Sequence, residues 1–334
     1  MPSPAPARLS GSLIGLAIGD ALGSVVEARP PEEARHYVAD YLRAGRAQEL
    51  GFGDFPFGQY SDDTQLAREL LLSLVARGGF DPGDFGRRIA TLVEHDRLIR
   101  GGLGTTGAAW RLLAGVHWEE AAEPSPYAGN GAAMRAGPLG ALWNSDMTRL
   151  RATALGQARV THQDPRAAAG ALAVAGAVAL GAREGPIDPA RFLVALDELV
   201  RPADATVADA ILGMKVWVGL DPERAVRHVA ASGLEPTAQG RWHGISSFVT
   251  SSVCWSLYAF LREPEDYWAA ITTAIEVGGD TDTIGAMSGA ISGARVGLER
   301  LPLHLAGRLN DRGEWAFEAL CDLAQSCGVA MGAD

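Results

Sequence analysis

Residues 9–26 read LSGSLIGLAIGDALGSVV, and this stretch sets the expected fold of the whole chain. Apolar and small residues recur in it at helical spacing, and Pro30-Pro31 ends the pattern because proline cannot continue a helix. Similar patterns follow along the chain, separated by breakers such as Gly-Pro, Asp-Pro and Gly-Gly. Almost no segment has the pattern of a strand. We therefore predict a compact all-α fold in which the frequent Gly and Ala let helices pack closely.

The predicted helices cover most of the sequence. After residues 9–26 they span residues 31–44, 62–77, 84–97, 105–113, 132–143, 147–161, 165–182, 189–200, 203–217, 222–230, 246–261, 264–277, 281–296, 303–309 and 312–327. No linker-like or low-complexity stretch divides them. We therefore predict one domain over residues 9–330, preceded by a flexible lead over residues 1–8.

Composition excludes several classes of protein. Of the 334 residues, 47% are hydrophobic and 21% are charged, which is typical of a folded protein with a sizeable core and excludes a disordered chain. The formal net charge of −11 argues against an extended nucleic-acid surface, because phosphate binding needs clustered Lys and Arg. A local basic contact remains open.

Nothing in the sequence indicates secretion or a membrane. The opening Met1-Pro2-Ser3-Pro4-Ala5-Pro6 lacks the charged start and apolar core of a signal peptide. The longest apolar run, residues 167–182, is too short for a standard membrane span and is expected to be a buried helix. Cys254, Cys321 and Cys327 form no CxxC pattern, so no disulfide framework or zinc site is indicated. We expect a cytoplasmic protein without a membrane partner.

Two acidic runs, Ser61-Asp62-Asp63-Thr64 and Asp280-Thr281-Asp282-Thr283, lie far apart in the sequence but share one chemistry. Each places hard oxygen ligands at a predicted helix N-terminus. Two carboxylates about 4 Å apart repel by roughly 4 kcal/mol at an effective dielectric of about 20, so four around one cavity would call for cations. Carboxylates and hydroxyls suit Mg²⁺ or Mn²⁺ better than zinc. If the fold joins the two runs, they make a metal site.

A second interpretation stays open for each run. Ser61 and Asp280 would be N-caps, and Asp62, Asp63 and Asp282 would complement the helix dipoles. The presence of two such runs, each pairing Asp with Thr, favours the metal site over two unrelated caps.

Glycine-rich loops before predicted helices give a further functional signal. Gly129-Asn130-Gly131-Ala132-Ala133-Met134-Arg135 lets backbone N–H groups approach a ligand, and its arginine adds a positive charge that suits a phosphate. Gly101-Gly102-Leu103-Gly104-Thr105-Thr106 can form an anion-binding nest in the same way. Neither loop matches the P-loop pattern, and neither follows a predicted strand.

Two single residues have an ordinary and a functional interpretation. His162, in Thr161-His162-Gln163-Asp164-Pro165, is by default a turn or helix-end histidine. Glu27 directly follows the first predicted helix and is by default a solvated helix end. No Lys lies near it in the sequence, so we expect it to be free for chemistry.

Taken together, these elements resemble the ADP-ribosylglycohydrolase family over most of the chain. The resemblance is carried by Gly19-Asp20-Ala21-Leu22-Gly23 leading to Glu27, by the two acidic runs with Gly278-Gly279 before the second, by residues 129–135 and by Thr161-His162. It implies an orthogonal multi-helix bundle of that family's type. It also implies a binuclear Mg²⁺ or Mn²⁺ centre that cleaves the bond between ribose C1″ of ADP-ribose and an acceptor atom.

The resemblance further implies a role for each matching residue. The metal ligands would be Ser61, Asp62, Asp63, Asp280, Asp282 and Thr283. The catalytic carboxylates would be Glu27, Asp63 and Asp280, among which the general base is left open. ADP-ribose would be held by Gly101, Gly102, Gly104, Gly129, Asn130, Gly131, Met134, Arg135 and His162.

One departure leaves the acceptor open. Arginine-specific members carry an aspartate before the second glycine loop, where this chain has Arg100, and the nearest upstream candidate is Asp96. The run at residues 280–283 is closer to the serine-type pattern. The expected partner is ADP-ribose, joined to a protein or to a small molecule. Two other classes stay open: a two-metal phosphohydrolase that cleaves a nucleotide diphosphate, and a non-catalytic ADP-ribose-binding or structural member.

Overall fold

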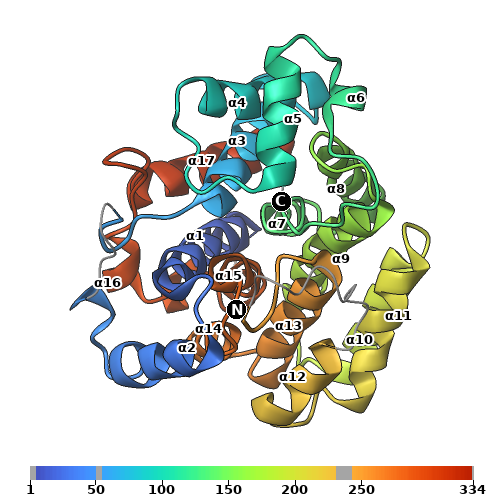
Figure 1. Cartoon of the computed structure of the whole chain (residues 1–334). Coiled ribbons are helices and arrows are strands. Elements are labelled where there is room, and N and C mark those ends of the chain that lie inside the picture. The colour runs from blue at the N-terminus through green and yellow to red at the C-terminus, as the bar shows by residue number, and fades with distance from the viewer. Residues whose placement is uncertain (1–4, 50–54, 231–242, 333–334) are drawn as a thin grey trace.

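The structure is a computed structural model that describes residues 5–49, 55–230 and 243–332. Within these residues every regular element is helical, and β-bridges occur only as isolated pairs such as Gln59 with Asn310. The predicted all-α fold is confirmed. In Figure 1 the other helices surround α1 (Ala5–Gly23) and α15 (Thr281–Val296), which lie near the centre of the view.

The remaining elements follow in chain order. The α-helices are α2 (Pro31–Tyr37), α3 (Asp62–Arg77), α4 (Pro82–Glu94), α5 (Leu103–Leu113), α6 (Trp118–Ala121), α7 (Gly137–Leu142), α8 (Met147–Arg159), α9 (Pro165–Gly181), α10 (Pro189–Val200), α11 (Ala205–Gly213), α12 (Pro222–Ala230), α13 (Val249–Arg262), α14 (Tyr267–Ile275), α16 (Leu303–Ala306) and α17 (Phe317–Met331). Single turns of 3₁₀-helix lie at η1 (Ser24–Val26), η3 (Ala47–Glu49), η4 (Met214–Val216) and η6 (Leu298–Arg300), and η2 (Val38–Leu42) is a π-helix.

Three helices begin four or five residues away from the predicted position, and several other boundaries also differ. Helix α1 begins at Ala5, so residues 5–8 do not belong to a flexible lead, and residues 1–4 of the expected lead lie outside the described part. The helix predicted over residues 132–143 begins only at Gly137, because Pro138 is tolerated in a first turn but not further inside. The last predicted helix, residues 312–327, runs instead over Phe317–Met331. Arg312 and Trp315 have positive φ angles of 50° and 45°, which a helix excludes.

Helices α1 and α15 pack backbone against backbone in antiparallel directions. A Cβ atom added to Gly15 would lie 2.3 Å from the carbonyl oxygen of Gly289, and one added to Gly285 would lie 2.4 Å from that of Gly19. Only glycine allows this approach. The glycines of this contact are Gly11, Gly15, Gly19 and Gly23 on α1 and Gly285, Gly289 and Gly293 on α15.

The segment Ala7–Val26 is long and apolar enough to cross a membrane by length and composition alone, with a mean hydropathy of 1.6. However, 89% of its most apolar window is buried inside the protein. Buried core helices and signal sequences pass the same test, so the finding by itself does not indicate a membrane. The cytoplasmic location stays a prediction.

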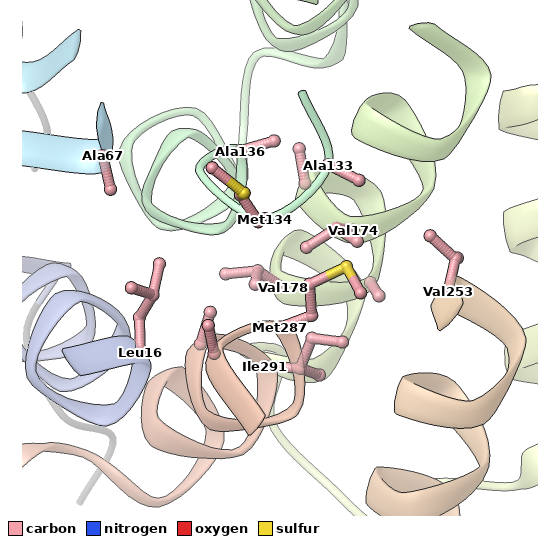
Figure 2. Packing of buried hydrophobic residues seen from close by; sticks show 14 of the residues in the cluster. Leu16, Ala67, Ala133, Met134, Ala136, Val174, Val178, Val253, Met287 and Ile291 are labelled. Carbon is pink, nitrogen blue, oxygen red and sulfur yellow. The ribbon is translucent and has the colours of Figure 1, made fainter. Parts of the chain in front are cut away.

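The core continues from α15 to α9, which is buried along most of its length as expected for residues 167–182. Figure 2 shows Val174 and Val178 of α9 beside Met287 and Ile291 of α15, with Leu16 of α1 in the same cluster. One hydrophobic cluster reaches from Leu9 in α1 to Met331 in α17. The single domain over residues 9–330 stays a prediction that this cluster supports.

The glycine contact makes a prediction about stability. Gly289→Ala should lower the free energy of unfolding by about 1–3 kcal/mol or more, as overpacking a core does, because its Cβ would lie 2.1 Å from the carbonyl oxygen of Gly15. Gly213→Ala is the control, since Gly213 has helical angles of −60° and −24° and no heavy atom within 4 Å of an added Cβ. It should leave stability unchanged or raise it by about 0.5–1 kcal/mol. Urea unfolding measures both, and equal stabilities would contradict the prediction.

Candidate metal centre and adjoining cavity

The two acidic runs meet in the structure. Asp63 lies in the first turn of α3 and Thr283 in the first turn of α15, and both line one cavity. The Thr283 hydroxyl lies 3.5 Å from Oδ2 of Asp63, to which it donates. The predicted convergence of the two runs is therefore present, although residues 63 and 283 are 220 positions apart.

A second group of carboxylates completes the cluster. Oxygens of Glu27, Asp280 and Asp282 all lie within 4.8 Å of one another. The Asn130 side chain holds Asp280 by donating to its Oδ2 at 2.6 Å, and it also donates to the Ser252 hydroxyl at 3.2 Å. Asn130 was expected to contact a ligand. In the structure it positions a candidate metal ligand as well as lining the cavity.

Asp20 also belongs to this site, although it was not predicted as a ligand or a catalytic residue. It is fully buried near the end of α1 and accepts hydrogen bonds from the backbone N–H of Ser61 at 2.9 Å and of Thr64 at 3.1 Å. The Thr64 hydroxyl donates to it at 2.6 Å. Asp20 therefore ties the first turn of α3 to α1. An aspartate inside an apolar helix is the signal that could have indicated it.

The cap interpretation holds for Ser61 but not for both runs. The Ser61 hydroxyl accepts from the backbone N–H of Asp63 at 3.4 Å and donates to its Oδ2 at 2.9 Å. Asp280, in contrast, precedes α15 without a side-chain cap bond. Asp282 accepts from the N–H of the neighbouring Thr283 at 2.8 Å. Capping therefore does not account for the clustering of the acidic side chains.

Burial and mutual repulsion raise the pKa of every carboxyl group in the cluster. Burial, followed by the charges of neighbouring carboxylates, raises the pKa values of Asp62, Asp63 and Asp282 well above their usual range. Burial raises the pKa of Asp280 to about 7. The charge of Asp282, followed by burial, raises the pKa of Glu27 to about 8. The cluster thus resists holding all its negative charges without compensating cations.

The site fits divalent cations on its own geometry. Oδ1 of Asp63 is buried and has no hydrogen-bond partner among the described residues, which is costly for a carboxylate oxygen unless a ligand takes that place. The donors are carboxylate and hydroxyl oxygens, the set that Mg²⁺ and Mn²⁺ prefer. The residues expected to hold the ions are those predicted above, and Glu27 lies close enough to contribute.

Glu27 is not free, contrary to the expectation from the sequence. Nη1 of Arg100 donates to Oε2 of Glu27 at 2.7 Å and to the carbonyl oxygen of Ser24 at 3.1 Å. The Arg100 guanidinium also lies 4.3 Å from the centre of the Phe55 ring. Arg100 lies 73 residues away from Glu27 in the sequence, so a pattern of neighbouring residues does not predict this pair.

A cavity of about 460 Å³ adjoins the carboxylates. Its lining includes most of the predicted site residues: Glu27, Asp62, Asp63, Gly101, Gly102, Gly104, Gly129, Asn130, Gly131, Met134, His162, Asp280, Asp282 and Thr283. Tyr127 and Ser247 also line it and were not predicted. Ser61 and Arg135 are the predicted residues that do not.

Arg135 does not carry its charge to a ligand in this structure. Its side chain is fully buried and turns away from the cavity, where Nε donates to the side chain of Gln157 at 2.6 Å and Nη2 to the hydroxyl of Thr161 at 2.8 Å. The guanidinium lies 5.1 Å from the centre of the Phe85 ring. Burial lowers the pKa of Arg135 to about 9. The side chain does not line the cavity, so the predicted phosphate contact stays a prediction that this arrangement does not support.

Arg135 instead acts on the cavity through Thr161 and His162. The Thr161 hydroxyl oxygen accepts a hydrogen bond from Arg135. The same hydroxyl lies 2.8 Å from Nδ1 of His162, to which it can donate its hydrogen. When the Thr161 hydroxyl donates to Nδ1, the neutral imidazole carries its proton on Nε2. Burial, followed by the charge of Arg135, lowers the pKa of His162 to about 3, so the ring is neutral near pH 7.

Glycines leave room for this imidazole in the cavity wall. A Cβ atom added to Gly104 would lie 2.9 Å from Nε2 of His162, and one added to Gly131 would lie 3.1 Å from its Cε1. Tyr127 stacks on the ring with centroids 5.7 Å apart. His162 is therefore held as a neutral N–H donor, and the glycines serve its placement as well as the approach of a ligand.

The fold is that of a known family. The sequence profile described as ADP-ribosylglycohydrolase matches residues 1–332, so the chain belongs to this family. It is 29% identical to "ADP-ribosylhydrolase ARH3" of Bos taurus, covering 88% of this chain and 86% of that protein. It is 26% identical to "ADP-ribosyl-[dinitrogen reductase] glycohydrolase" of Rhodospirillum rubrum, covering 88% and 87%.

A solved structure agrees with this assignment. The chain is similar to the structure titled "ADP-ribosylglycohydrolase-related protein complex", with a TM-score of 0.66 and 27% identity over 98% of this chain and 99% of that one. The all-helical bundle of the family's type, implied by the resemblance in sequence, is confirmed.

The raised pKa values predict opposite effects of pH with and without metal. Between about pH 6 and pH 8 the folded protein holds protons on Asp280 and Glu27, whereas the same groups in the unfolded chain, with pKa values of about 4, are ionised. The folded state binds more protons, so in chelator the free energy of unfolding should fall as pH rises through this window. Divalent cations compete with these protons, so stabilisation by Mn²⁺ should grow over the same window.

Thermal unfolding in EDTA and in Mn²⁺, across this pH window, measures both slopes. Asp282→Asn should flatten the slope in EDTA and lose the gain from Mn²⁺, because it removes the charge that most raises the pKa of Glu27. Asp322→Asn, which changes an exposed aspartate of α17, should keep both. A melting temperature that does not respond to Mn²⁺ at about pH 8 would contradict the metal site.

Proposed function

We propose that this protein hydrolyses the bond between C1″ of ADP-ribose and an acceptor atom of a modified side chain, and so releases ADP-ribose. The observation that carries the proposal is the position of the carboxylate cluster in the wall of a cavity that also presents a neutral histidine donor and two glycine-rich loops. The volume of about 460 Å³ falls within the usual range of small-molecule sites, about 300–1,000 Å³. Family membership and the names of the relatives support the same reaction.

The protein's acidic residues would hold two divalent ions. These would be bound by Ser61, Asp62, Asp63, Asp280, Asp282 and Thr283. Mg²⁺ or Mn²⁺ in this place supplies positive charge that grips ribose hydroxyls and lowers the pKa of a bound water. Ser61 does not line the cavity, so its contact with an ion would come from the side of α3.

The carboxylates also suit the reaction itself. Breaking the C1″ bond gives the ribose oxocarbenium character, which nearby negative charge stabilises. A water oxygen adds to C1″ while the bond from C1″ to the acceptor atom breaks. One water proton passes to a carboxylate, and a carboxyl group returns a proton to the acceptor, so that ADP-ribose and the unmodified acceptor are released. Glu27, Asp63 and Asp280 all line the cavity and are the candidates for the proton acceptor.

The position of Arg100 favours a neutral acceptor over a cationic one. Its guanidinium is bound to Glu27 at the cavity wall, where an arginine-type acceptor would bring a second positive charge. Like charges repel, whereas a serine-type acceptor is neutral. We therefore propose ADP-ribosyl-serine, or another oxygen-linked conjugate, as the substrate.

The decisive assay offers ADP-ribosyl-serine and ADP-ribosyl-arginine peptides in parallel, with Mg²⁺, with Mn²⁺ and with EDTA. We expect metal-dependent release of ADP-ribose, faster from the serine peptide, and a loss of at least about 10²-fold in kcat for Asp282→Asn. Asp322→Asn should remain active because its side chain is exposed on α17. Release of AMP would show cleavage of the diphosphate instead, and binding of ADP-ribose without release would show a non-catalytic reader.

Thr161→Val tests the placement of His162. The substitution keeps the shape of the side chain but removes the oxygen that accepts from Arg135 and the hydrogen within reach of Nδ1. We expect KM for the ADP-ribosyl substrate to rise by about fivefold to tenfold with little change in kcat, as for the loss of one hydrogen bond of about 1–1.4 kcal/mol. Thr161→Ser restores the hydroxyl and should restore KM. A Ser variant as impaired as the Val variant would contradict this role.

A further inference from the structure

Helix α5 exposes an apolar face beside the cavity. Leu103 is 78% exposed, Trp110 is 58% exposed and Leu113 is 36% exposed, and all three lie on this one helix. Together with Thr106, Gly107 and Ala114 they recur at the spacing of a single helix face. We call these six residues the α5 face. None of the six is charged, although the Arg111–Glu123 ion pair lies beside Gly107, where an added Cβ atom would be 3.3 Å from Oε2 of Glu123.

The opposite side of α5 is already used by the fold. Gly104, Thr105, Ala108 and Ala109 are buried there. Arg111, on the flank, is turned toward the next segment, where it donates to Glu123 at 2.6 Å and to the carbonyl oxygen of Ala121 at 2.6 Å. A helix that is apolar on two sides is normally covered on both. Helix α5 packs against α4 and α6 at the edge of the fold, as Figure 1 shows, and its second side stays open.

The α5 face is continuous with the candidate active site. Leu103 both lines the cavity and is largely exposed, so it stands where the cavity meets the surface. From there the face runs along α5 for about 15 Å, at about 1.5 Å per residue, to Leu113. A conjugate that ends at a single amino acid would not extend this far beyond the cavity. A polypeptide that carries the ADP-ribosyl group would lie across it.

We infer that the α5 face is the docking surface for the polypeptide part of an ADP-ribosylated protein, which contacts Trp110 and Leu113 through apolar residues near the modified side chain. This inference rests on the proposed function and extends it from the type of bond to the type of substrate: a modified protein is preferred over a small-molecule conjugate. Exposed aromatic and aliphatic residues bordered by charged side chains, here the Arg111–Glu123 pair, are typical of such contacts.

Other exposed apolar residues do not share this arrangement. Val216 and Val329 are each 82% exposed, but they lie in η4 and in α17 and do not line the cavity. Single exposed apolar residues are ordinary on protein surfaces. They serve as controls because they are also exposed apolar residues but lie away from the cavity.

The test compares two substrates with the same linkage. One is a folded ADP-ribosylated protein and the other is ADP-ribose joined to a single serine. In the double variant Trp110→Gln and Leu113→Gln, kcat/KM for the protein substrate should fall about tenfold, whereas kcat/KM for the small conjugate should not change. Glutamine keeps the helix propensity of α5. Val216→Gln and Val329→Gln should change neither value.

The outcomes separate the inference from the proposed function. Hydrolysis of the small conjugate by the unmodified protein tests the function, and the ratio of the two kcat/KM values tests the docking surface. An unchanged ratio in the double variant overturns the inference, and so does an equal loss on both substrates. If the unmodified protein is a dimer and the double variant is a monomer in light scattering, the α5 face is covered by a second copy and the inference is overturned. If neither substrate is hydrolysed, the inference falls with the function.

Discussion

The backbone contact between α1 and α15 is the constraint on which the rest of the site depends. Because the helices are antiparallel, the end of α1 lies beside the start of α15, where the Thr281 hydroxyl donates to the carbonyl oxygen of Gly23 at 2.8 Å. Just beyond, the backbone N–H of Ala28 donates to the carbonyl oxygen of Gly279 at 2.7 Å. Side chains between the helices would separate Glu27 from Asp282. The glycines therefore set the spacing of the carboxylates as well as the packing.

Asp20 extends this constraint to the third helix of the site. Its carboxylate is held by the first turn of α3, so the position of α1 also fixes Asp62 and Asp63. The arrangement brings several buried negative charges together, and their raised pKa values measure the electrostatic cost. Such a cluster is unfavourable in an apolar core unless something compensates it. The contact between α1 and α15 and the hydrogen bonds to Asp20 hold these carboxyl groups in fixed positions, as a cation site requires.

The sequence predicted the regular parts of this structure well. Residues 62–77 and 281–296 form helices with the predicted bounds, because a cap or a glycine of positive φ marks their ends: Ser61 and Gly78 for the first, and Gly297 for the second. The oxygen-rich runs were found because their composition alone indicates their chemistry. In each case the signal lies within a few neighbouring residues.

Side-chain directions in loops were not predictable in the same way. Arg135 was assigned to a ligand, but it contacts Gln157 and Thr161, which lie 22 and 26 residues further along the chain. Glu27 is paired with Arg100 over a separation of 73 residues. No periodicity connects such positions, so their contacts follow only from the packed fold. The sequence motifs predicted most of the residues that line the cavity, but they did not predict the direction in which each side chain points.

The charges around the cavity link the binding of cations to the binding of anions. Arg100 is the one Lys or Arg among the described residues of the lining, and it is already paired with Glu27. His162 is neutral, and the charge of Arg135 is held in the core behind Thr161. A diphosphate would therefore meet donors that orient it, whereas each carboxyl group of the wall that loses its proton would repel it. Cations that neutralise the carboxylates remove this repulsion, and by thermodynamic linkage the bound anion must strengthen cation binding by the same factor.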